Sequence, residues 1–230
     1  MNDLVHYRLE NGVAIVQIRN GKVNALSPQV IEALNGALDR AEADKAVTVL
    51  TGQPGILSGG YDLKVMTSSP ASALQLVASG SALTRRMLAH PLPLIVACSG
   101  HAIAKGAFLL LACDYRIAAG GDFRIGLNEV QIGMTMHQAG IVLARDRLTP
   151  AAFQRAVINA EIFAPEAACQ AGFVDFVVPE QELMEHAMEV AGQFRQLNMR
   201  AHRQTKHRVR QTLLDELEQA IQADLQHGFE

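Results

Sequence analysis

The sequence predicts an α/β fold in which parallel strands are joined by helical crossovers. Short runs of β-branched residues alternate with helical segments between residues 13 and 119, which is the pattern of such a fold. From about Thr149 the character of the sequence changes to helices. With 230 residues, of which 49% are hydrophobic, the chain can bury the core of one large domain or of two small ones.

The first unit of the alternation is a strand, a helix and a strand. Residues 13–18 and 46–51 are rich in β-branched side chains, and residues 27–44 repeat apolar side chains at helical spacing. Ser27 can cap this helix, and Pro28 suits its first turn. The two residues therefore mark where the helix begins.

The alternation recurs further along the chain. We expect a helix over residues 80–90, a buried strand over 93–99, a buried helix over 105–114 and another strand over 115–119. Strands that alternate with helices in this way form a parallel sheet.

The last third of the chain is predicted to be mostly helical. Residues 149–160 form a helix with a threonine cap and an early proline, and residues 164–172 form a helix that ends at a glycine. A strand over residues 173–178 follows, and the tail from Glu180 is helical. Its final segment carries an apolar stripe formed by Leu213, Leu214, Leu217, Ile221 and Leu225. Such a stripe must be buried on the same chain or on a partner subunit.

The composition argues against several classes of function. The formal net charge of −3 and the pI near 6.2 argue against a surface built for nucleic acid. The three cysteines, Cys98, Cys113 and Cys169, are far apart, so we expect neither a disulfide framework nor a zinc site. The longest apolar run, residues 107–113, is too short to span a bilayer, and the N-terminus lacks a leader pattern. We therefore expect a soluble, cytoplasmic protein without a bound metal.

Two glycine-rich stretches each follow a predicted strand and lead into a helix. They are residues 54–64 and residues 99–108. Glycine lets a ligand approach backbone N–H groups, and two such turns are what an oxyanion hole requires. The first stretch can equally be a plain turn. In the second stretch, Lys105 can simply extend to water, and His101 can be a hydrogen-bonded turn residue.

A single carboxylate, Glu129, lies in the apolar and glycine-rich run of residues 126–134. Burial there would raise the pKa of Glu129 toward the range of a useful general base. The alternative is a surface glutamate at the end of a strand. His137 is a second candidate for the same chemistry, with a weaker case.

A basic run covers residues 200–210. It contains Arg200, Arg203, Lys206, Arg208 and Arg210, together with His202 and His207. A solvated helix face accounts for such a run, and the functional alternative is a local patch for a phosphate-rich ligand.

Four segments taken together resemble the crotonase family, the enoyl-CoA hydratase and isomerase superfamily. They are KVNALSPQVIEAL at 22–34, LSGGYDLKVM at 57–66, PLPLIVACSGHAIAKGAFLLLACDYRIAA at 91–119 and APEAACQAGFVDFVVP at 164–179. The resemblance implies a spiral of ββα units over residues 1–178, followed by a helical region over 179–230 that is used in trimer formation. A homotrimer or a dimer of trimers is therefore expected.

The resemblance also assigns site residues. It implies that the oxyanion-binding N–H groups belong to Tyr61 and Lys105, although the family commonly has glycine at the second position. The residues implied for substrate and CoA binding are Ala25, Ser58, Gly60, Asp62, Gly106 and Phe108. The basic run is a hypothetical binding site for the 3′-phosphate of CoA. If the chain forms trimers, the run would bind the CoA of a neighbouring subunit. No cofactor is implied beyond coenzyme A as part of the substrate.

The number of carboxylates separates the reactions of this family. Its hydratases usually carry two glutamates, whereas this sequence has Phe108 at the first position and Glu129 at the second. The closest resemblance is therefore to the single-glutamate Δ3,Δ2-enoyl-CoA isomerases, in which one base moves a proton from C2 to C4. The alternatives are a specialised hydratase or thioester hydrolase that uses Glu129 with His137 or a bound water, a catalytically weak acyl-CoA binder, and a subunit whose trimer surface is its main function.

Overall fold

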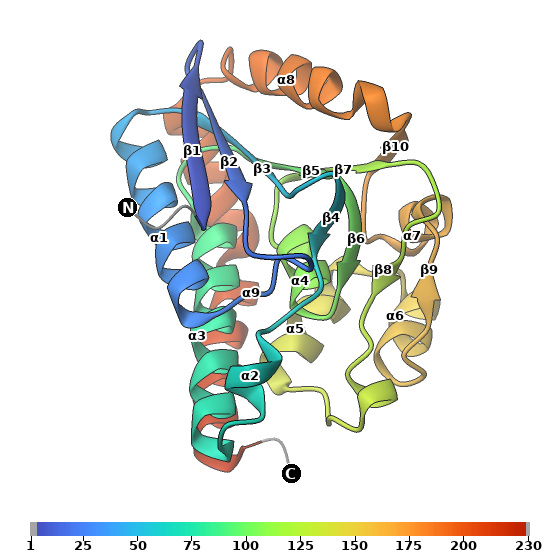
Figure 1. The fold of residues 1–230 in the computed structure, drawn as a ribbon. Coiled ribbons are helices and arrows are strands. Elements are labelled where there is room, and N and C mark those ends of the chain that lie inside the picture. Colours follow the sequence, from blue (N-terminus) through green and yellow to red (C-terminus); the bar gives the residue numbers. More distant parts are fainter. Residues whose placement is uncertain (1–3, 229–230) are drawn as a thin grey trace.

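The computed structural model describes residues 4–228, and its strands form two sheets (Figure 1). The larger sheet has six strands in the order β1-β2-β3-β5-β7-β10. Their bounds are Val5–Glu10, Val13–Ile18, Val47–Thr51, Leu94–Cys98, Tyr115–Ala119 and Phe176–Val178. Strand β1 pairs antiparallel with β2, and each later pair in this sheet is parallel.

The smaller sheet has four strands in the order β4-β6-β8-β9. Their bounds are Gly55–Ser58, Gly100–Ile103, Ile125–Gly126 and Ile162–Phe163. Strands β3, β5 and β7 of the larger sheet are each followed directly by a strand of the smaller sheet and then by helix. This repetition confirms the predicted α/β fold of ββα units.

Helices surround the two sheets. Their bounds are α1 Pro28–Ala43, α2 Leu63–Met66, α3 Pro70–Ala89, α4 Lys105–Leu111, α5 Gln138–Arg147, α6 Pro150–Val157, α7 Pro165–Ala171, α8 Leu183–Phe194 and α9 Met199–His227, with 3₁₀ turns η1 Val130–Ile132 and η2 Glu180–Glu182. Ser27 caps α1 as predicted, since its hydroxyl accepts the N–H of Val30. Among the described residues, no helix is long and apolar enough to cross a membrane.

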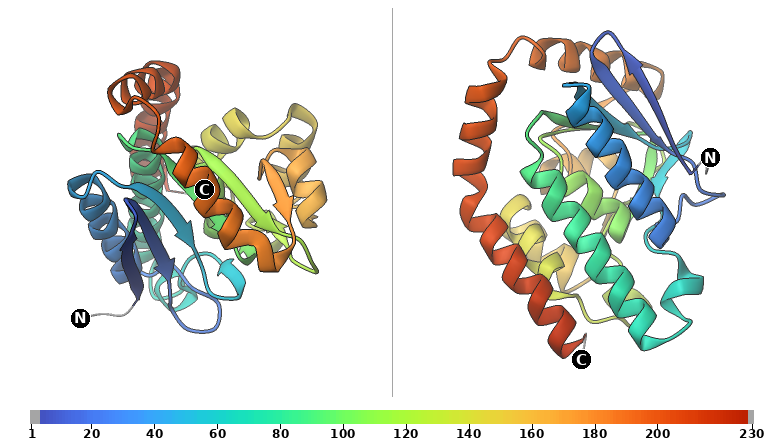
Figure 2. Two further views of the ribbon diagram at one scale, coloured as in Figure 1. Left: turned by 90° about the horizontal axis from the view of Figure 1, so that it is seen from above. Right: turned by 90° about the vertical axis from the view of Figure 1, so that its left-hand side faces the viewer.

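The C-terminal helices close the molecule on two sides. Helix α8 covers one face of the larger sheet, and the long helix α9 runs beside α3 and α5 (Figure 2). The predicted apolar stripe is buried within the same chain at Leu213, Leu214, Leu217 and Ile221, whereas Leu225 is 37% exposed. The division at residue 178 and the role in trimer formation stay predictions, and residues 1–3 and 229–230 lie outside the described range.

Candidate active site

A cavity of about 560 Å³ lies among α2, the start of α3 and the segment around η1. Its wall is mostly apolar, with a few polar groups. The lining residues are Gly59, Tyr61, Leu63, Met66, Thr67, Ala73, Val77, Ala104, Asn128, Glu129, Ile132, Met134, Thr135 and His137. The cavity thus brings residues of both predicted glycine-rich turns together with Glu129.

The first turn presents Tyr61. Leu26 donates its N–H to the carbonyl of Gly60 at 2.8 Å and accepts the N–H of Asp62 at 3.1 Å. In a parallel bridge of this kind, the bonds go to the residues on either side of Tyr61, so the Tyr61 N–H points away from Leu26. The phenol hydroxyl donates to the carbonyl of Val77 at 3.3 Å, and burial raises its pKa.

The second turn presents Lys105 as the first residue of α4. N–H groups in the first turn of a helix have no acceptor within the helix, so the Lys105 N–H is available to a ligand. The preceding residue, Ala104, has φ 51° and ψ −121°, a conformation that L-residues rarely adopt. Backbone strain of this kind is common where a turn must aim a group at a ligand.

The two turns touch each other through glycines. A Cβ on Gly106 would lie 2.2 Å from the carbonyl oxygen of Ser58, so only glycine fits there. Gly60 has φ 103°, and a Cβ on it would lie 3.1 Å from the Cβ of Ala104 and 3.6 Å from the nitrogen of Lys105. The close approach fixes the first turn against the start of α4.

Glu129 lies at the wall of the cavity and is 7% exposed, so the alternative of a surface glutamate is wrong. Its Oε2 atom has no hydrogen-bond partner among the described residues. Burial raises the pKa of Glu129 from 4.5 to about 7, against an opposing effect of Lys105. A carboxyl group with that pKa suits a general base near neutral pH.

Phe108 lies behind the cavity wall, at 1% exposure. His137 lines the cavity and covers it, with the two ring centroids 5.4 Å apart in an edge-to-face arrangement. Gly140 makes room for both rings, because a Cβ on it would lie 2.7 Å from His137 and 2.8 Å from Phe108. Burial lowers the pKa of His137 to about 3, so its imidazole is neutral near pH 7.

The other residues predicted to bind substrate or CoA have positions near the first turn. Ser58 is fully buried, and its hydroxyl donates to the carbonyl of Asn24 and accepts the N–H of Gly60. Asp62 caps α2 by accepting the N–H of Lys64. Ala25 accepts a hydrogen bond from an asparagine side chain at 2.7 Å. Ser58, Asp62 and Ala25 therefore do not line the cavity, and their hydrogen bonds hold the first turn in shape.

Two buried residues that sequence reasoning missed position the site. The amide of Asn24 binds the carbonyls of Ile18 and Leu57, which joins the segment before α1 to β4. Asp224, near the end of α9, accepts the N–H of Gln138 at 2.7 Å and that of Ala139 at 3.0 Å, which caps α5. The φ of 47° at Asn24 fits a turn asparagine, whereas no sequence signal links residue 224 to residue 138.

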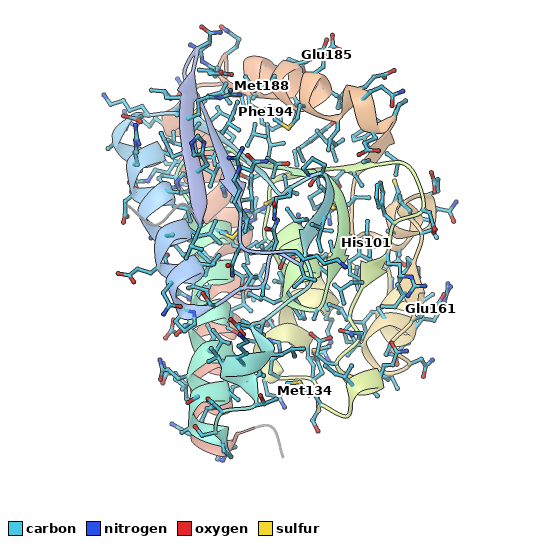
Figure 3. The ribbon with its side chains drawn as sticks, viewed as in Figure 1. His101, Met134, Glu161, Glu185, Met188 and Phe194 are labelled. Carbon is cyan, nitrogen blue, oxygen red and sulfur yellow. The ribbon has the colours of Figure 1, made fainter. Side chains whose placement is uncertain are left out.

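His101 is outside the cavity. It belongs to β6, and in Figure 3 its label lies above that of Met134, which lines the cavity. The Nδ1 atom of His101 accepts the N–H of Arg124 at 3.0 Å, and the imidazole ring packs edge-on against Phe123. The structural alternative for His101 is therefore the better one.

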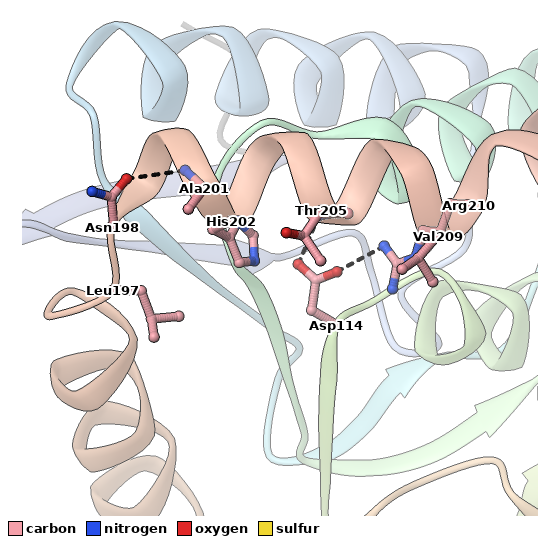
Figure 4. A pocket seen from close by; sticks show the side chains of 9 residues that line it. Asp114, Leu197, Asn198, Ala201, His202, Thr205, Val209 and Arg210 are labelled. Carbon is pink, nitrogen blue, oxygen red and sulfur yellow. Dashed lines mark hydrogen bonds and ion pairs between the residues drawn. The ribbon is translucent and has the colours of Figure 1, made fainter.

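The basic run lies on the first half of α9, where Lys206 and Arg210 both pair with Asp114 (Figure 4). The pairing leaves Arg200, Arg203, His207 and Arg208 exposed. Twenty-one residues separate Arg203 from Asp224, or about 30 Å along a helix. Within one chain the run is therefore far from the candidate site, and a role toward a neighbouring subunit stays a prediction.

The cysteines are not paired with one another. Cys98 and Cys113 are buried, Cys169 is half-buried, and all three are free thiols. Within residues 4–228, no group of three or more His, Cys, Asp or Glu side chains is arranged to hold a metal ion.

Comparison with known proteins identifies relatives along almost the whole chain. Residues 8–228 match the family described as enoyl-CoA hydratase/isomerase. Human enoyl-CoA delta isomerase 1, mitochondrial, is 32% identical over 221 residues, which cover 94% of this chain and 73% of that protein. The 2,3-dehydroadipyl-CoA hydratase of Escherichia coli K12 is 28% identical over 227 residues, which cover 98% of this chain and 87% of that protein.

A solved structure resembles the fold closely. The crystal structure of an enoyl-CoA hydratase/isomerase family protein from Pseudomonas syringae superposes with a TM-score of 0.97 at 64% identity. The match covers 98% of each chain. The relatives include proteins named as isomerases and proteins named as hydratases, so the reaction must be inferred from the site itself.

Proposed function

The chain belongs to the enoyl-CoA hydratase/isomerase family, and from that premise we propose that it is a Δ3,Δ2-enoyl-CoA isomerase. The observation that carries the proposal is Glu129, which is the one carboxylate among the described residues that line the cavity. Phe108 occupies the position at which hydratases of the family carry their other glutamate, and the ring of His137 covers it. A site with one acid can move a proton but has no second acid to hold a water.

The proposed reaction needs one base and one oxyanion hole. The Glu129 carboxylate removes a proton from C2 of a 3-enoyl thioester, and the electron pair of that C–H bond moves onto the thioester oxygen as a dienolate. Protonated Glu129 then returns the proton to C4, and the double bond forms between C2 and C3. No water is added at any stage. The N–H groups of Tyr61 and Lys105 stabilise the oxygen where its negative charge develops.

The wall of the cavity supports this chemistry. The wall is mostly apolar, and burial raises the pKa of the Glu129 carboxyl to about 7. Exclusion of water by a bound acyl chain would suppress competing hydration. The substrate class is an acyl-CoA thioester, for which enzymes of this family need no cofactor beyond coenzyme A itself.

A second candidate is a specialised hydratase or thioester hydrolase. His137 favours it, because a neutral imidazole in the same cavity as Glu129 can orient or activate a water. The Escherichia coli relative that is 28% identical to this chain is named as a hydratase.

Separate assays of 3-enoyl-CoA and 2-enoyl-CoA distinguish the two candidates. An isomerase converts the first substrate and forms no 3-hydroxyacyl-CoA from the second. Glu129→Gln keeps the size of the side chain and removes the base, so we expect kcat for 3-enoyl-CoA to fall about a thousandfold. Glu185→Gln is a matched control, since Glu185 is exposed on α8 and does not line the cavity. Full isomerase activity in Glu129→Gln would refute the proposal.

A further inference from the structure

The side chain of Lys105 is buried behind the candidate oxyanion site. It is 1% exposed, so it does not extend to water. Its ammonium group reaches α3, where it donates to the carbonyl of Gly80 at 2.6 Å and to the hydroxyl of Thr84 at 3.3 Å. Thr84 is itself held by the carbonyl of Ser81 at 2.8 Å. The charge of residue 105 thus lies in the interior, whereas its N–H is the donor proposed for the oxyanion site.

Two aromatic rings lie near this ammonium group, and one carboxylate acts on it electrostatically. Its Nζ lies 5.9 Å from the ring centroids of both Tyr61 and Phe108. The titratable groups that act on it are Glu129 from the η1 segment and His137 at the start of α5. Asp224 of α9 acts on the nearby Tyr61. The atoms that α3 contributes, the Gly80 carbonyl and the Thr84 hydroxyl, carry no net charge.

Burial works against the charged form of Lys105, and Glu129 supports it. Desolvation lowers the pKa of Lys105 to about 7, and the negative charge of Glu129 acts in the opposite direction. The same interaction lowers the pKa of Glu129 against the effect of its own burial. A methionine or leucine would fill the same space without the desolvation cost of a buried ammonium group. The presence of a lysine here therefore suggests that its charge takes part in the reaction.

We propose that Lys105 is a positioning residue whose buried ammonium group, held by Gly80 and Thr84, keeps Glu129 ionised and balances the dienolate. This inference rests on the isomerase function proposed above. Before the reaction, the buried ammonium group and the buried Glu129 carboxylate carry opposite charges that attract each other. After proton transfer, Glu129 is neutral and the negative charge lies on the thioester oxygen beside the Lys105 N–H. The lysine keeps its proton throughout, so the site stays electrically balanced in both states.

Lys105→Met tests the proposal, because it removes the charge and keeps both the N–H and most of the side-chain volume. Lys206→Met is the matched control, since Lys206 is the other buried lysine and pairs with Asp114 far from the cavity. The first measurement is the titration of the Glu129 carboxyl carbon by NMR of ¹³C-labelled enzyme, assigned with Glu129→Gln. We expect Lys105→Met to raise the midpoint by about one pH unit, and Lys206→Met to leave it unchanged.

The second measurement is the pH profile of kcat/KM for 3-enoyl-CoA. In the wild type it rises as Glu129 ionises near pH 7 and falls again as Lys105 loses its proton. In Lys105→Met the acid limb moves to higher pH, the alkaline fall disappears, and the value on the acid limb, at about pH 6, drops about tenfold. A purely structural lysine would change stability without moving either limb.

The NMR titration needs no substrate, so it separates the two proposals. If the wild type converts no 3-enoyl-CoA, the isomerase function fails. If a folded Lys105→Met enzyme shows the wild-type Glu129 midpoint, the inference on Lys105 fails. Should that variant not fold, Thr84→Val removes one partner of the ammonium group, and a shift of the Glu129 midpoint is then expected. An unchanged midpoint in that variant overturns the proposal.

Discussion

Phe108 and His137 form an aromatic pair beside the cavity that Glu129 lines. Phe108 does not line the cavity, and its ring packs edge-to-face against that of His137, which does. We therefore expect a glutamate at residue 108 to reach the cavity only if the imidazole is removed as well. On the isomerase proposal, the two rings together occupy the space in which a hydratase of this family would hold its water.

Hydration should appear when both rings are replaced. We expect Phe108→Glu combined with His137→Ala to hydrate 2-enoyl-CoA about a hundredfold faster than the control Phe108→Leu with His137→Ala, because a second acid can then hold and activate a water. The product, 3-hydroxyacyl-CoA, is measured by chromatography. If the folded glutamate variant formed no more product than the leucine control, the rings would not be what excludes water.

At the scale of single residues, sequence reasoning found Glu129 but not its surroundings. An isolated acid in an apolar, glycine-rich run is visible in the sequence, and its burial is what the structure adds. The direction of the Lys105 side chain was not predictable, because Gly80 and Thr84 lie on a helix about twenty residues away in the chain. A lysine can extend to water or bind a carbonyl that is remote in the chain, and the residues next to it in the sequence do not indicate which of the two it does.

Among the elements, the contact between β4 and the start of α4 depends on one glycine, Gly106. Gly106→Ala would place a methyl group 2.2 Å from the Ser58 carbonyl oxygen, which cannot move without shifting β4. We expect a loss of about 2–3 kcal/mol in the free energy of unfolding, measured with urea. We also expect a loss of isomerase activity, because the clash separates the two turns.

Gly36→Ala provides the comparison for that variant. Gly36 lies in the exposed face of α1, and nothing lies within 4 Å of a Cβ built on it. Alanine should stabilise this helix by about 1 kcal/mol, because glycine is a poor helix former. If Gly106→Ala were as stable as Gly36→Ala and equally active, the contact between the turns would not matter.

The predicted elements differ from the observed ones for local reasons. Strand 13–18 and strand 115–119 have the predicted bounds, and α1 begins where its serine cap and proline indicate. Strands β4 and β6 were not predicted, because each lies inside a glycine-rich stretch that reads as a turn. Helix α5 was missed because its cap comes from Asp224 and not from a neighbouring residue.

In the molecule as a whole, α9 connects the start of β5 to the start of α5, next to the candidate site. Its first half is fixed to the start of β5 through Asp114, which binds Lys206 and Arg210 and also accepts the N–H of Leu94. Its last turns supply Asp224 to the start of α5. The residue before that start is His137, which lines the cavity.

Asp224→Ala should therefore affect both stability and substrate binding. Loss of the two hydrogen bonds at the N-terminus of α5 should lower the free energy of unfolding by about 1–2 kcal/mol. Because His137 then loses its support, we expect KM for acyl-CoA to rise. Urea denaturation and steady-state kinetics measure the two effects.

Asp215→Ala is the control on the same helix. Asp215 is exposed, and its carboxylate accepts hydrogen bonds from the side chain of Gln211. Its replacement should change the free energy of unfolding by less than about 0.5 kcal/mol. Equal stability and equal KM in the two variants would show that α9 does not support the site.

The proposed oxyanion donors are main-chain groups, and this has a consequence for how such a site can diversify. Any residue except proline supplies an N–H at positions 61 and 105, so the donors are encoded by the turns and not by the amino acids that occupy them. The side chains at those two positions are free to be recruited for other tasks while the donors persist. On the proposal made above, the lysine at residue 105 has taken on such a task. Libraries that vary only residues 61 and 105 would then alter charge and pocket shape around an unchanged pair of donors.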